Sequence, residues 1–191
     1  MPQPDEILGF WFERSPTEPT TWKYRKAWFS KDPNFDQEIR TRFLPVYEQA
    51  AAGELDFWQE TAAGSLALVL VLDQFPRNMF RDQPQAFATD EKALAVTKGA
   101  IDSGFDQMLP PVQRWFLYLP LMHSEDLSDQ NRCVELFDFL ATEPDVESGS
   151  YAVRHRDVIQ RFGRFPHRNR ILGRTNTPEE AEFLKQPGSS F

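Results

Sequence analysis

The residues best suited to chemistry lie near the C-terminus, in a segment rich in arginine. Between Tyr151 and Arg174 the chain holds seven arginines and a single acidic residue, Asp157. Guanidinium groups match carboxylates and phosphates, which both accept two hydrogen bonds from one arginine. The chain has a formal net charge of −8, so this segment, at about +6, leaves about −14 elsewhere. The asymmetry is consistent with two roles: an anion site, or internal ion pairs between these arginines and acidic residues elsewhere.

A short motif of the segment also occurs earlier in the chain. "DQFPRN" starts at Asp73, and "GRFPHRN" starts at Gly163. In both, an apolar helical pattern leads into Phe-Pro, and proline disfavours helical geometry in the residue before it. We therefore expect helices to end at Phe75 and Phe165. The arginine after each proline would then lie near the last carbonyls of its helix.

These two turns define the candidate binding residues. One interpretation is structural: a helix-ending turn that occurs twice. The other is that the two turns meet in space and hold one anion between them. The residues expected to bind an acidic peptide or a small anion are Arg77, Asn78, Arg164, His167, Arg168 and Arg174.

Histidine could supply acid–base chemistry, because its pKa lies close to neutral pH. We consider His123 or His167 as a general acid or base, with Glu125 or Asp73 as its partner. His155 follows the apolar positions of its segment, so we expect a core histidine.

Other catalytic patterns have little support. A serine-hydrolase triad from His123, Ser124 and Glu125 would need adjacent residues to point at one another, and a capping Ser124 with Glu125 paired to an arginine explains the same letters. A metal site would require His123 and Glu125 to converge with His155 or His167, without the spacing of known metal motifs. Phosphate-binding glycine loops are absent from the sequence. We predict no metal and no cofactor.

Composition limits the partners. A net charge of −8 argues against nucleic acid and anionic membrane surfaces, since both require a basic surface. Cys133 is the only cysteine, and its surroundings predict helix packing. The longest apolar run, Leu66 to Leu72, is far shorter than the roughly 20 residues of a membrane span. We expect a cytoplasmic protein.

Helical signals dominate the elements that must position these residues. Asp32-Pro33 forms a start signal, and Gly53 forms a stop signal. Phe35 and Ile39 begin a series of apolar residues on one helical face. Further helical segments are expected around 56–75, 84–104, 110–125, 124–144 and 148–163, and Thr177 opens a last helix with a capping box.

In these segments, Leu127, Val134, Phe137 and Ala141 form one predicted apolar stripe, and Tyr151, Val158, Ile159 and Phe162 form another. We also expect Pro120 to kink or stop its helix. The sequence predicts an all-α fold, with residues 1–191 forming one domain of seven to nine helices in antiparallel pairs.

Several longer motifs resemble a known family. "LDQFPRNMFR", "AFATD", "YLPLMHSED", "FGRFPHRN" and "NTPEE" occur in the order typical of the bacterial domain-of-unknown-function 924 family. The resemblance extends from "ILGFWF" to "FLKQPG". It implies an all-helical array similar to the tetratricopeptide (TPR-like) superfamily, and it implies no established activity.

Two functions follow as hypotheses. The first is a binding module, in which a TPR-like groove takes an acidic peptide, a protein partner or a small anion. The second is an enzyme that acts on a small anionic metabolite through a histidine–glutamate pair.

Overall fold

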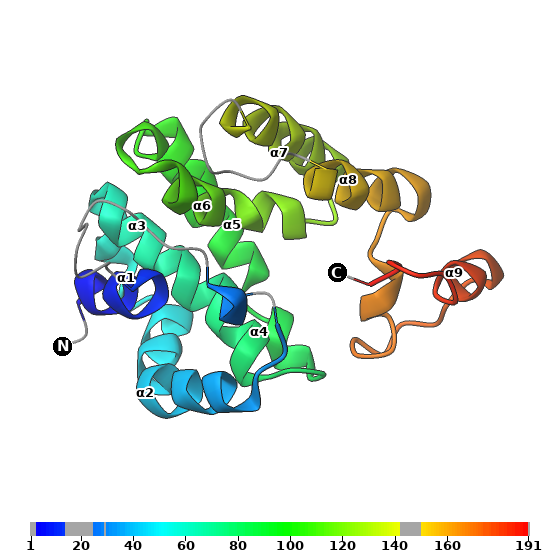
Figure 1. The fold of residues 1–191 in the computed structure, drawn as a ribbon, viewed down its shortest axis with the longest axis horizontal. Helices are drawn as coiled ribbons and strands as arrows, with labels where there is room; N and C mark the ends of the chain where they lie inside the picture. The colour runs from blue at the N-terminus through cyan, green and yellow to red at the C-terminus, as the bar shows by residue number, and fades with distance from the viewer. Residues whose placement is uncertain (1–2, 14–24, 29, 142–149, 191) are drawn as a thin grey trace. The chain divides into compact units, whose positions relative to one another are not determined.

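The computed structural model describes residues 3–13, 25–28, 30–141 and 150–190. Within these ranges the regular elements are helices, and no strand is present (Figure 1). The prediction of an all-α fold is confirmed. No helix in the described ranges is both long enough and apolar enough to cross a membrane. The α-helices are α1 (Pro4–Phe12), α2 (Pro33–Ala52), α3 (Ala62–Val69), α4 (Phe75–Met79), α5 (Asp90–Asp102), α6 (Pro111–His123), α7 (Leu127–Leu140), α8 (Ser150–Phe162) and α9 (Pro178–Phe183).

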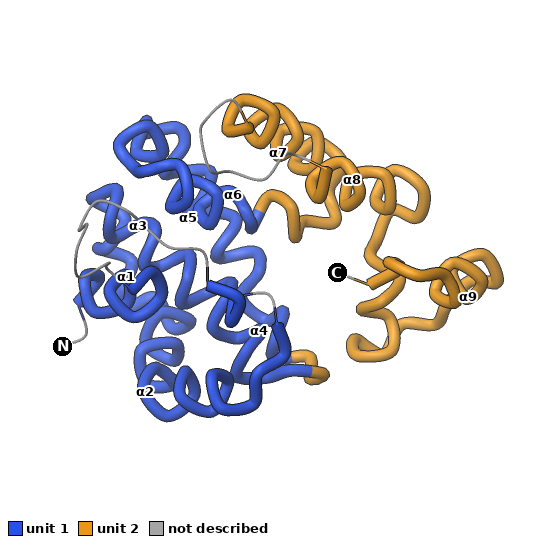
Figure 2. Tube along the Cα trace, viewed as in Figure 1, with its two compact units in different colours: residues 1–81, 85–120 blue, residues 82–84, 121–191 orange. Residues whose placement is uncertain are grey.

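The chain divides into two compact units (Figure 2). Unit 1 comprises residues 1–81 and 85–120, and unit 2 comprises residues 82–84 and 121–191. Helix α6 runs from one unit into the other, because the division falls after Pro120. The expectation of a single domain over residues 1–191 stays a prediction.

Helix α2 begins and ends where the sequence indicates. The side chain of Asp32 accepts hydrogen bonds from the backbone N–H groups of Asn34 and Phe35, and Pro33 occupies the first turn. Gly53 closes the helix in the left-handed conformation, with a φ of 87° that other residues rarely adopt. The predicted apolar face is buried, from Phe35 and Ile39 onward.

The core of unit 1 is rich in aromatic rings. Trp11 of α1 contacts Phe116 of α6 edge-on, with ring centroids 5.5 Å apart. Trp28 lies 4.8 Å from the same ring and donates its indole N–H to the carbonyl of Trp11. Edge-on aromatic pairs of this kind add to the stabilisation from burial.

The central helical segment confirms one prediction and corrects another. Every residue from Leu66 to Leu72 is fully buried, as expected of a central helix. However, the chain stays helical at Phe75, where φ is −60° and ψ is −43°. The predicted end of the helix at this residue is therefore wrong. A π-helical segment at Leu70–Gln74 precedes Pro76, and the helix continues past this proline. In the π-helical segment the N–H of Phe75 bonds to the carbonyl of Leu70.

The side chain of the residue that precedes α5 supports this irregular segment. Pro76 has no N–H, so in a regular α-helix the carbonyl of Leu72 would lose its partner. The hydroxyl of Thr89 donates a 2.6 Å hydrogen bond to that carbonyl. The carbonyl of Leu72 therefore keeps a donor where the helix continues through Pro76 to Met79.

Helix α6 also continues past its internal proline. Pro120 does not stop the helix, which ends at His123. The side-chain amide of Gln130, itself fully buried, donates to the carbonyls of Met122 and Ser124, both at 2.7 Å. These bonds satisfy carbonyls that the end of a helix leaves open.

Unit 2 contains the packed pair α7 and α8. Val158 and Ile159 of α8 form a small core with Phe165. The predicted stripes extended too far, because Leu127 and Tyr151 are exposed at the ends of their helices. Apolar spacing identifies a helical face, but the first turn of a helix has a neighbour only if the partner helix reaches it.

Candidate functional site

The candidate site lies in the turn that follows α8. Helix α8 ends at Phe162, and Gly163 takes the left-handed conformation, with a φ of 66°. Phe165 is extended, with φ −87° and ψ 106°, and Pro166–Arg168 form one turn of 3-10 helix. Here the predicted effect of proline on the preceding residue is confirmed. We call residues 163–169 the C-terminal turn.

Phe165 is the centre of this turn. Its side chain is fully buried, and the guanidinium of Arg168 lies over the ring, 4.5 Å from the centroid. The rings of His155 and His167 also contact Phe165, at centroid distances of 5.7 and 5.6 Å. One aromatic ring therefore brings together an arginine and two histidines. Arg168 and His155 are each only 6% exposed.

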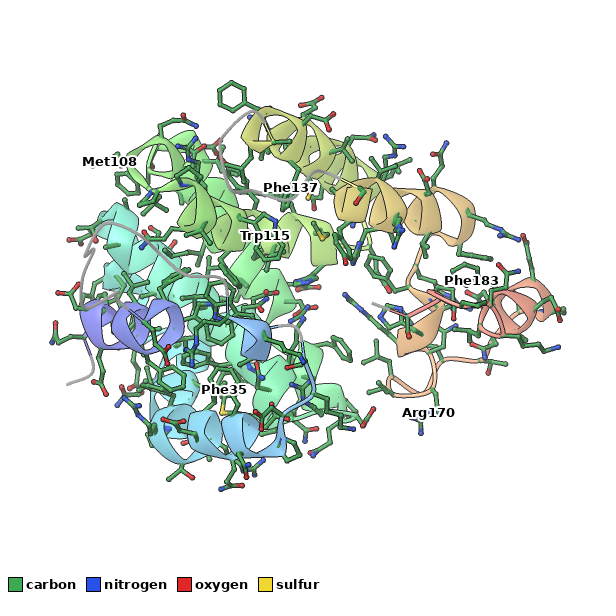
Figure 3. All side chains as sticks on the ribbon, in the orientation of Figure 1. Phe35, Met108, Trp115, Phe137, Arg170 and Phe183 are labelled. Atoms are coloured by element: carbon green, nitrogen blue, oxygen red, sulfur yellow. The ribbon has the colours of Figure 1, made fainter. Side chains whose placement is uncertain are left out.

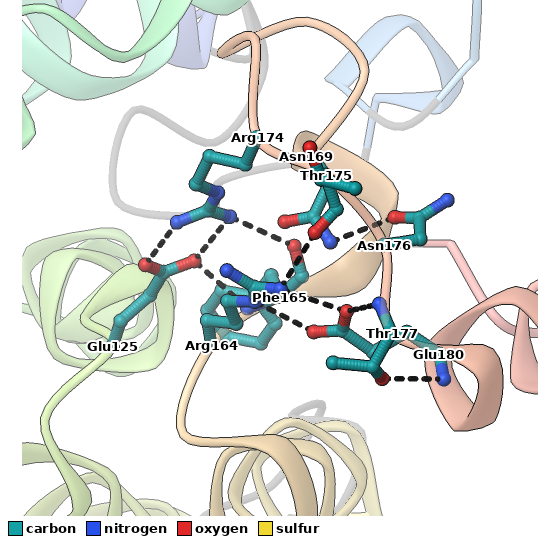
Figure 4. A network of polar contacts seen from close by, with 9 residues as sticks. All are labelled: Glu125, Arg164, Phe165, Asn169, Arg174, Thr175, Asn176, Thr177 and Glu180. Carbon is teal, nitrogen blue, oxygen red and sulfur yellow. Dashed lines mark hydrogen bonds and ion pairs between the residues drawn. The ribbon is translucent and has the colours of Figure 1, made fainter.

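An ion pair holds the backbone of the same residue. Arg174 donates from Nη1 and Nη2 to the two carboxylate oxygens of Glu125, at 2.7 and 3.0 Å (Figure 4). Glu125 also accepts the N–H of Phe165 at 2.8 Å, and Arg174 donates to the carbonyl of Phe165 at 3.1 Å. The expected pairing of Glu125 with an arginine is confirmed.

A second ion pair connects the turn to α9. Arg164 donates from Nε and Nη2 to the two carboxylate oxygens of Glu180, at 2.6 and 2.8 Å (Figure 4). It also donates to the carbonyl of Thr175. Glu180 completes the predicted capping box with Thr177, which is confirmed. The bond from Arg164 is the main cause that lowers the pKa of Glu180 to about 2.

The histidines of the site are neutral at pH 7. Burial lowers the pKa of His167 to about 4, and the nearby charge of Arg168 contributes. Burial likewise lowers the pKa of His155 to about 3, although its bond to the carbonyl of Tyr151 opposes the shift. His123 interacts electrostatically with both. The expectation that His155 is a core residue is confirmed by its burial.

Glu125 differs from a general acid. Burial raises the pKa of Glu125. The hydrogen bonds from Arg174 and from the N–H of Phe165 lower this pKa by a larger amount, so the net shift is downward. The group is therefore an anion at pH 7 that accepts three hydrogen bonds. Ser124 next to it donates to Asp129 at 2.9 Å, and the N-cap of α7 is Asp126 instead of Ser124.

Most other arginines of the arginine-rich segment also have partners within the chain. Arg161 pairs with Glu179 at 2.9 Å, and Arg156 pairs with Asp157 at 2.9 Å. Arg154 lies over the ring of Tyr151. Arg170 is exposed and projects from the loop after the turn (Figure 3). Internal ion pairing, one of the two predicted roles, therefore accounts for several of these arginines.

The earlier motif lies in unit 1 and is bonded in its own way. Arg77 donates to both carboxylate oxygens of Asp90, at 2.9 and 3.1 Å, and lies 3.2 Å from the fully buried carboxylate of Asp73. Burial lowers the pKa of Arg77, but Asp73 and Asp90 raise this pKa by more, so the guanidinium of Arg77 stays protonated. The amide of Asn78 donates to Asp36 at 2.8 Å.

Unit 1 also contains a recess of about 420 Å³. Its lining combines both ends of α1 with one face of α2 and is charged but acidic on balance. The lining residues are Asp5, Glu6, Gly9, Phe10, Glu13, Arg25, Glu38 and Arg42. Arg42 bonds to Glu38, and Arg25 pairs with Glu13. None of the predicted binding residues lines this recess.

Metal and thiol chemistry have no site in the part of the chain that the structure describes. It holds no group of three or more His, Cys, Asp or Glu side chains arranged to bind a metal ion. Cys133 is fully buried in α7, and burial raises the pKa of its thiol well above the usual range. The prediction that Cys133 packs in a helix is confirmed.

The sequence pattern missed two sets of contacts that involve the turn. The sequence identifies Phe165 only as the residue before a proline, whereas Phe165 contacts His155, His167 and Arg168. The sequence identifies Glu180 only as a capping residue, whereas Glu180 also binds Arg164. The repeated motif "GRFPHRN" pointed to this turn, but nothing in its letters identified the distant partners.

Comparisons with other proteins identify the family of this chain. A family described as "Bacterial protein of unknown function (DUF924)" matches residues 7–188. A solved structure of a protein of unknown function from Agrobacterium tumefaciens is 42% identical in sequence to this chain. The alignment covers 95% of this chain and 96% of the other chain, and the two structures superpose with a TM-score of 0.82. No curated protein matches. The TPR-like relationship stays a prediction. The match over nearly the whole chain shows that this protein belongs to the DUF924 family.

Proposed function

We propose that this protein is a binding module whose C-terminal turn recognises an anion, either a small acid or an acidic peptide. The observation that carries the proposal is the position of Arg168: its guanidinium is buried against Phe165, with His167 and His155 on the same ring. A charge-assisted hydrogen bond is stronger in such a shielded place than in water.

The geometry ranks the candidate residues. Arg168 and His167 are the residues that we propose contact the anion. The guanidinium carbon of Arg168 lies 4.5 Å from the ring centroid of Phe165, and a guanidinium carries five N–H donors in a rigid plane. His167, neutral at pH 7, offers one donor and one acceptor.

The remaining candidates are not proposed to contact the anion. Arg164 and Arg174 each bind a carboxylate at two points within unit 2. Arg77 and Asn78 bind acidic side chains within unit 1. The hypothesis that the two motifs share one anion, and the TPR-like groove for a protein partner, stay predictions.

The test is a titration of the purified protein with inorganic phosphate and with acetylated Asp-Asp, followed by calorimetry. Arg168→Gln removes the proposed contact, and Arg170→Gln, which removes an exposed arginine of the following loop, is the matched control. We expect the R168Q variant to lose at least about tenfold in affinity, as removal of a charge-assisted bond would cause, and the R170Q variant to bind like the wild type. Equal affinities for both variants would refute the proposal.

A second candidate function is an enzyme that acts on a small anionic metabolite. Its support is the mutual electrostatic interaction of His123, His155 and His167 in one unit. His123 or His167 would act as the acid or base. Glu125 is held as an anion by Arg174, and Asp73 belongs to unit 1 and pairs with Arg77.

Mass spectrometry of the natively purified protein separates the two functions. An anionic metabolite that co-purifies with the protein and is released chemically unchanged supports the binding module. A metabolite that is converted during incubation, and no longer converted by a His123→Asn variant, establishes the enzyme.

A further inference from the structure

We infer that Glu125 and Arg174 are the positioning residues of the proposed anion site, and that they act through the peptide groups of Phe165 without contacting the anion. This inference rests on the proposed function. Both residues were candidates for direct roles from the sequence, Glu125 in catalysis and Arg174 in binding. The structure instead directs their hydrogen bonds toward the backbone that carries His167 and Arg168.

Phe165 needs hydrogen-bond partners that α8 does not supply. It is fully buried and extended, so its N–H and carbonyl lie outside the hydrogen bonding of α8. Glu125 accepts the N–H at 2.8 Å, and the carbonyl accepts from Arg174 and from the backbone of Arg168, both at 3.1 Å. A buried peptide group without partners would cost about 1–3 kcal/mol. The ion pair therefore fixes the conformation in which the chain leaves α8.

Arg174 also holds the far end of the segment. Its backbone N–H bonds to the carbonyl of Asn169 at 2.8 Å. Its side chain therefore bonds to Phe165 and its backbone to Asn169, and the residues between these two points include His167 and Arg168. A shift at either point would move both proposed contact residues relative to each other.

Electrostatics makes the inference testable by its sign. Glu125 is an anion near Arg168, and their interaction contributes to its lowered pKa. If Glu125 acted on a bound anion through charge alone, Glu125→Gln would remove a repulsion and strengthen anion binding. If Glu125 positions the turn, the same substitution weakens binding, because it breaks the two-point ion pair with Arg174.

The Arg164–Glu180 pair provides the matched control. It is also a two-point ion pair of the C-terminal turn, but it has no hydrogen bond to the peptide groups of Phe165. Glu180→Gln should lower thermal stability while leaving phosphate affinity within about twofold of the wild type. Glu125→Gln should lower phosphate affinity by about tenfold, the change expected from one charge-assisted hydrogen bond.

The experiment measures phosphate affinity and thermal unfolding of the full chain for E125Q, E180Q, R168Q and R174K. R174K keeps the charge but cannot make the two-point contact, so it should weaken binding as E125Q does, and it serves if E125Q does not fold. Unchanged or tighter binding by E125Q and R174K, with R168Q impaired, would overturn the positioning role and leave the proposed function standing. Wild-type affinity in R168Q would instead overturn the proposed function.

Discussion

The imidazole of His155 meets the ring of Phe165 edge-on, with centroids 5.7 Å apart and planes at 76°. Its Nδ1 donates a 2.7 Å hydrogen bond to the carbonyl of Tyr151, one turn earlier in α8. Burial is the main cause that lowers the pKa of His155 to about 3, and the positive charge of Arg168 and the histidines at 123 and 167 add to it. A neutral histidine is therefore part of the core of unit 2.

This arrangement predicts a loss of stability on mild acidification. The folded pKa of His155 is about 3, and the ordinary value is 6.5, so between these pH values the unfolded chain binds more protons than the folded one. The free energy of unfolding should therefore fall as the pH falls below 6.5. At pH 5 the titration of His155 should lower the free energy of unfolding by about 2 kcal/mol. Denaturant unfolding at pH 7 and pH 5 measures the difference.

A His155→Phe variant is the control for this effect. It keeps an aromatic ring in the core but removes the titrating group. We expect a smaller stability loss between pH 7 and pH 5 than in the wild type, with the remainder due to His167, whose pKa is about 4. Glu180 titrates near pH 2 and contributes little in this window. An equal loss in both proteins would contradict the prediction.

Two glycines predict opposite effects of the same substitution. A Cβ at Gly64 would overlap the carbonyl oxygen of Trp58, a backbone atom that cannot move away. Gly64→Ala should therefore destabilise the protein by about 2 kcal/mol or more. Gly99 is exposed within α5, and a Cβ there would meet no atom within 4 Å. Gly99→Ala should stabilise by about 0.5–1 kcal/mol.

Thermal unfolding of the two variants against the wild type tests this pair. The measurement is internally controlled, because both changes add one methyl group at a helical glycine. A similar effect of both substitutions would show that the close approach of Trp58 to α3 is not important for stability.

The capping box of α9 predicts a local effect. The hydroxyl of Thr177 accepts the N–H of Glu180 at 3.2 Å, and the carboxylate of Glu180 accepts the N–H of Thr177 at 2.6 Å. Thr177→Ala should reduce stability by about 1 kcal/mol, and amide hydrogen exchange should quicken in α9 before it quickens in α8. Thr177→Ser keeps the acceptor and should retain most of the protection. Equal protection in the alanine variant would rule out a role of the cap.

Cys133 should be unreactive in the folded protein. Its side chain is fully buried, and the raised pKa keeps the thiol protonated. A thiol-specific disulfide reagent at pH 8 should therefore react at least about 100-fold more slowly with the native protein than with the protein in guanidinium chloride. Rapid labelling of the native protein would mean that α7 opens readily.

Local signals predicted the helices well where capping chemistry marks them. Asp32 with Pro33, Gly53, and Thr177 with Pro178 all act as the sequence indicates. The predictions failed where a distant residue changes the local rule. Phe75 and Phe165 both precede a proline, yet only Phe165 leaves helical geometry. The hydroxyl of Thr89, 17 positions from Leu72, helps the earlier helix to continue.

The candidate site was predicted in part. The arginine count and the "GRFPHRN" motif located the C-terminal turn, and the alternative of internal ion pairing anticipated the engaged arginines. The specific partners were not predictable. Arg174 and Glu125 are 49 positions apart, and Arg164 and Glu180 are 16 apart. Such pairs depend on how helices and loops fold together, which single-residue spacing does not encode.

The π-helix at Leu70–Gln74 has a further consequence for comparing sequences. A π-turn contains one residue more than the α-turn that it replaces, so the helical positions before and after it differ in phase by about 100°. A relative with an uninterrupted α-helix here would need a one-residue deletion to keep Asp73 and Arg77 on their present side of the helix. Among relatives of this chain, the presence or absence of that single residue therefore indicates whether Asp73 and Arg77 keep their present side of the helix.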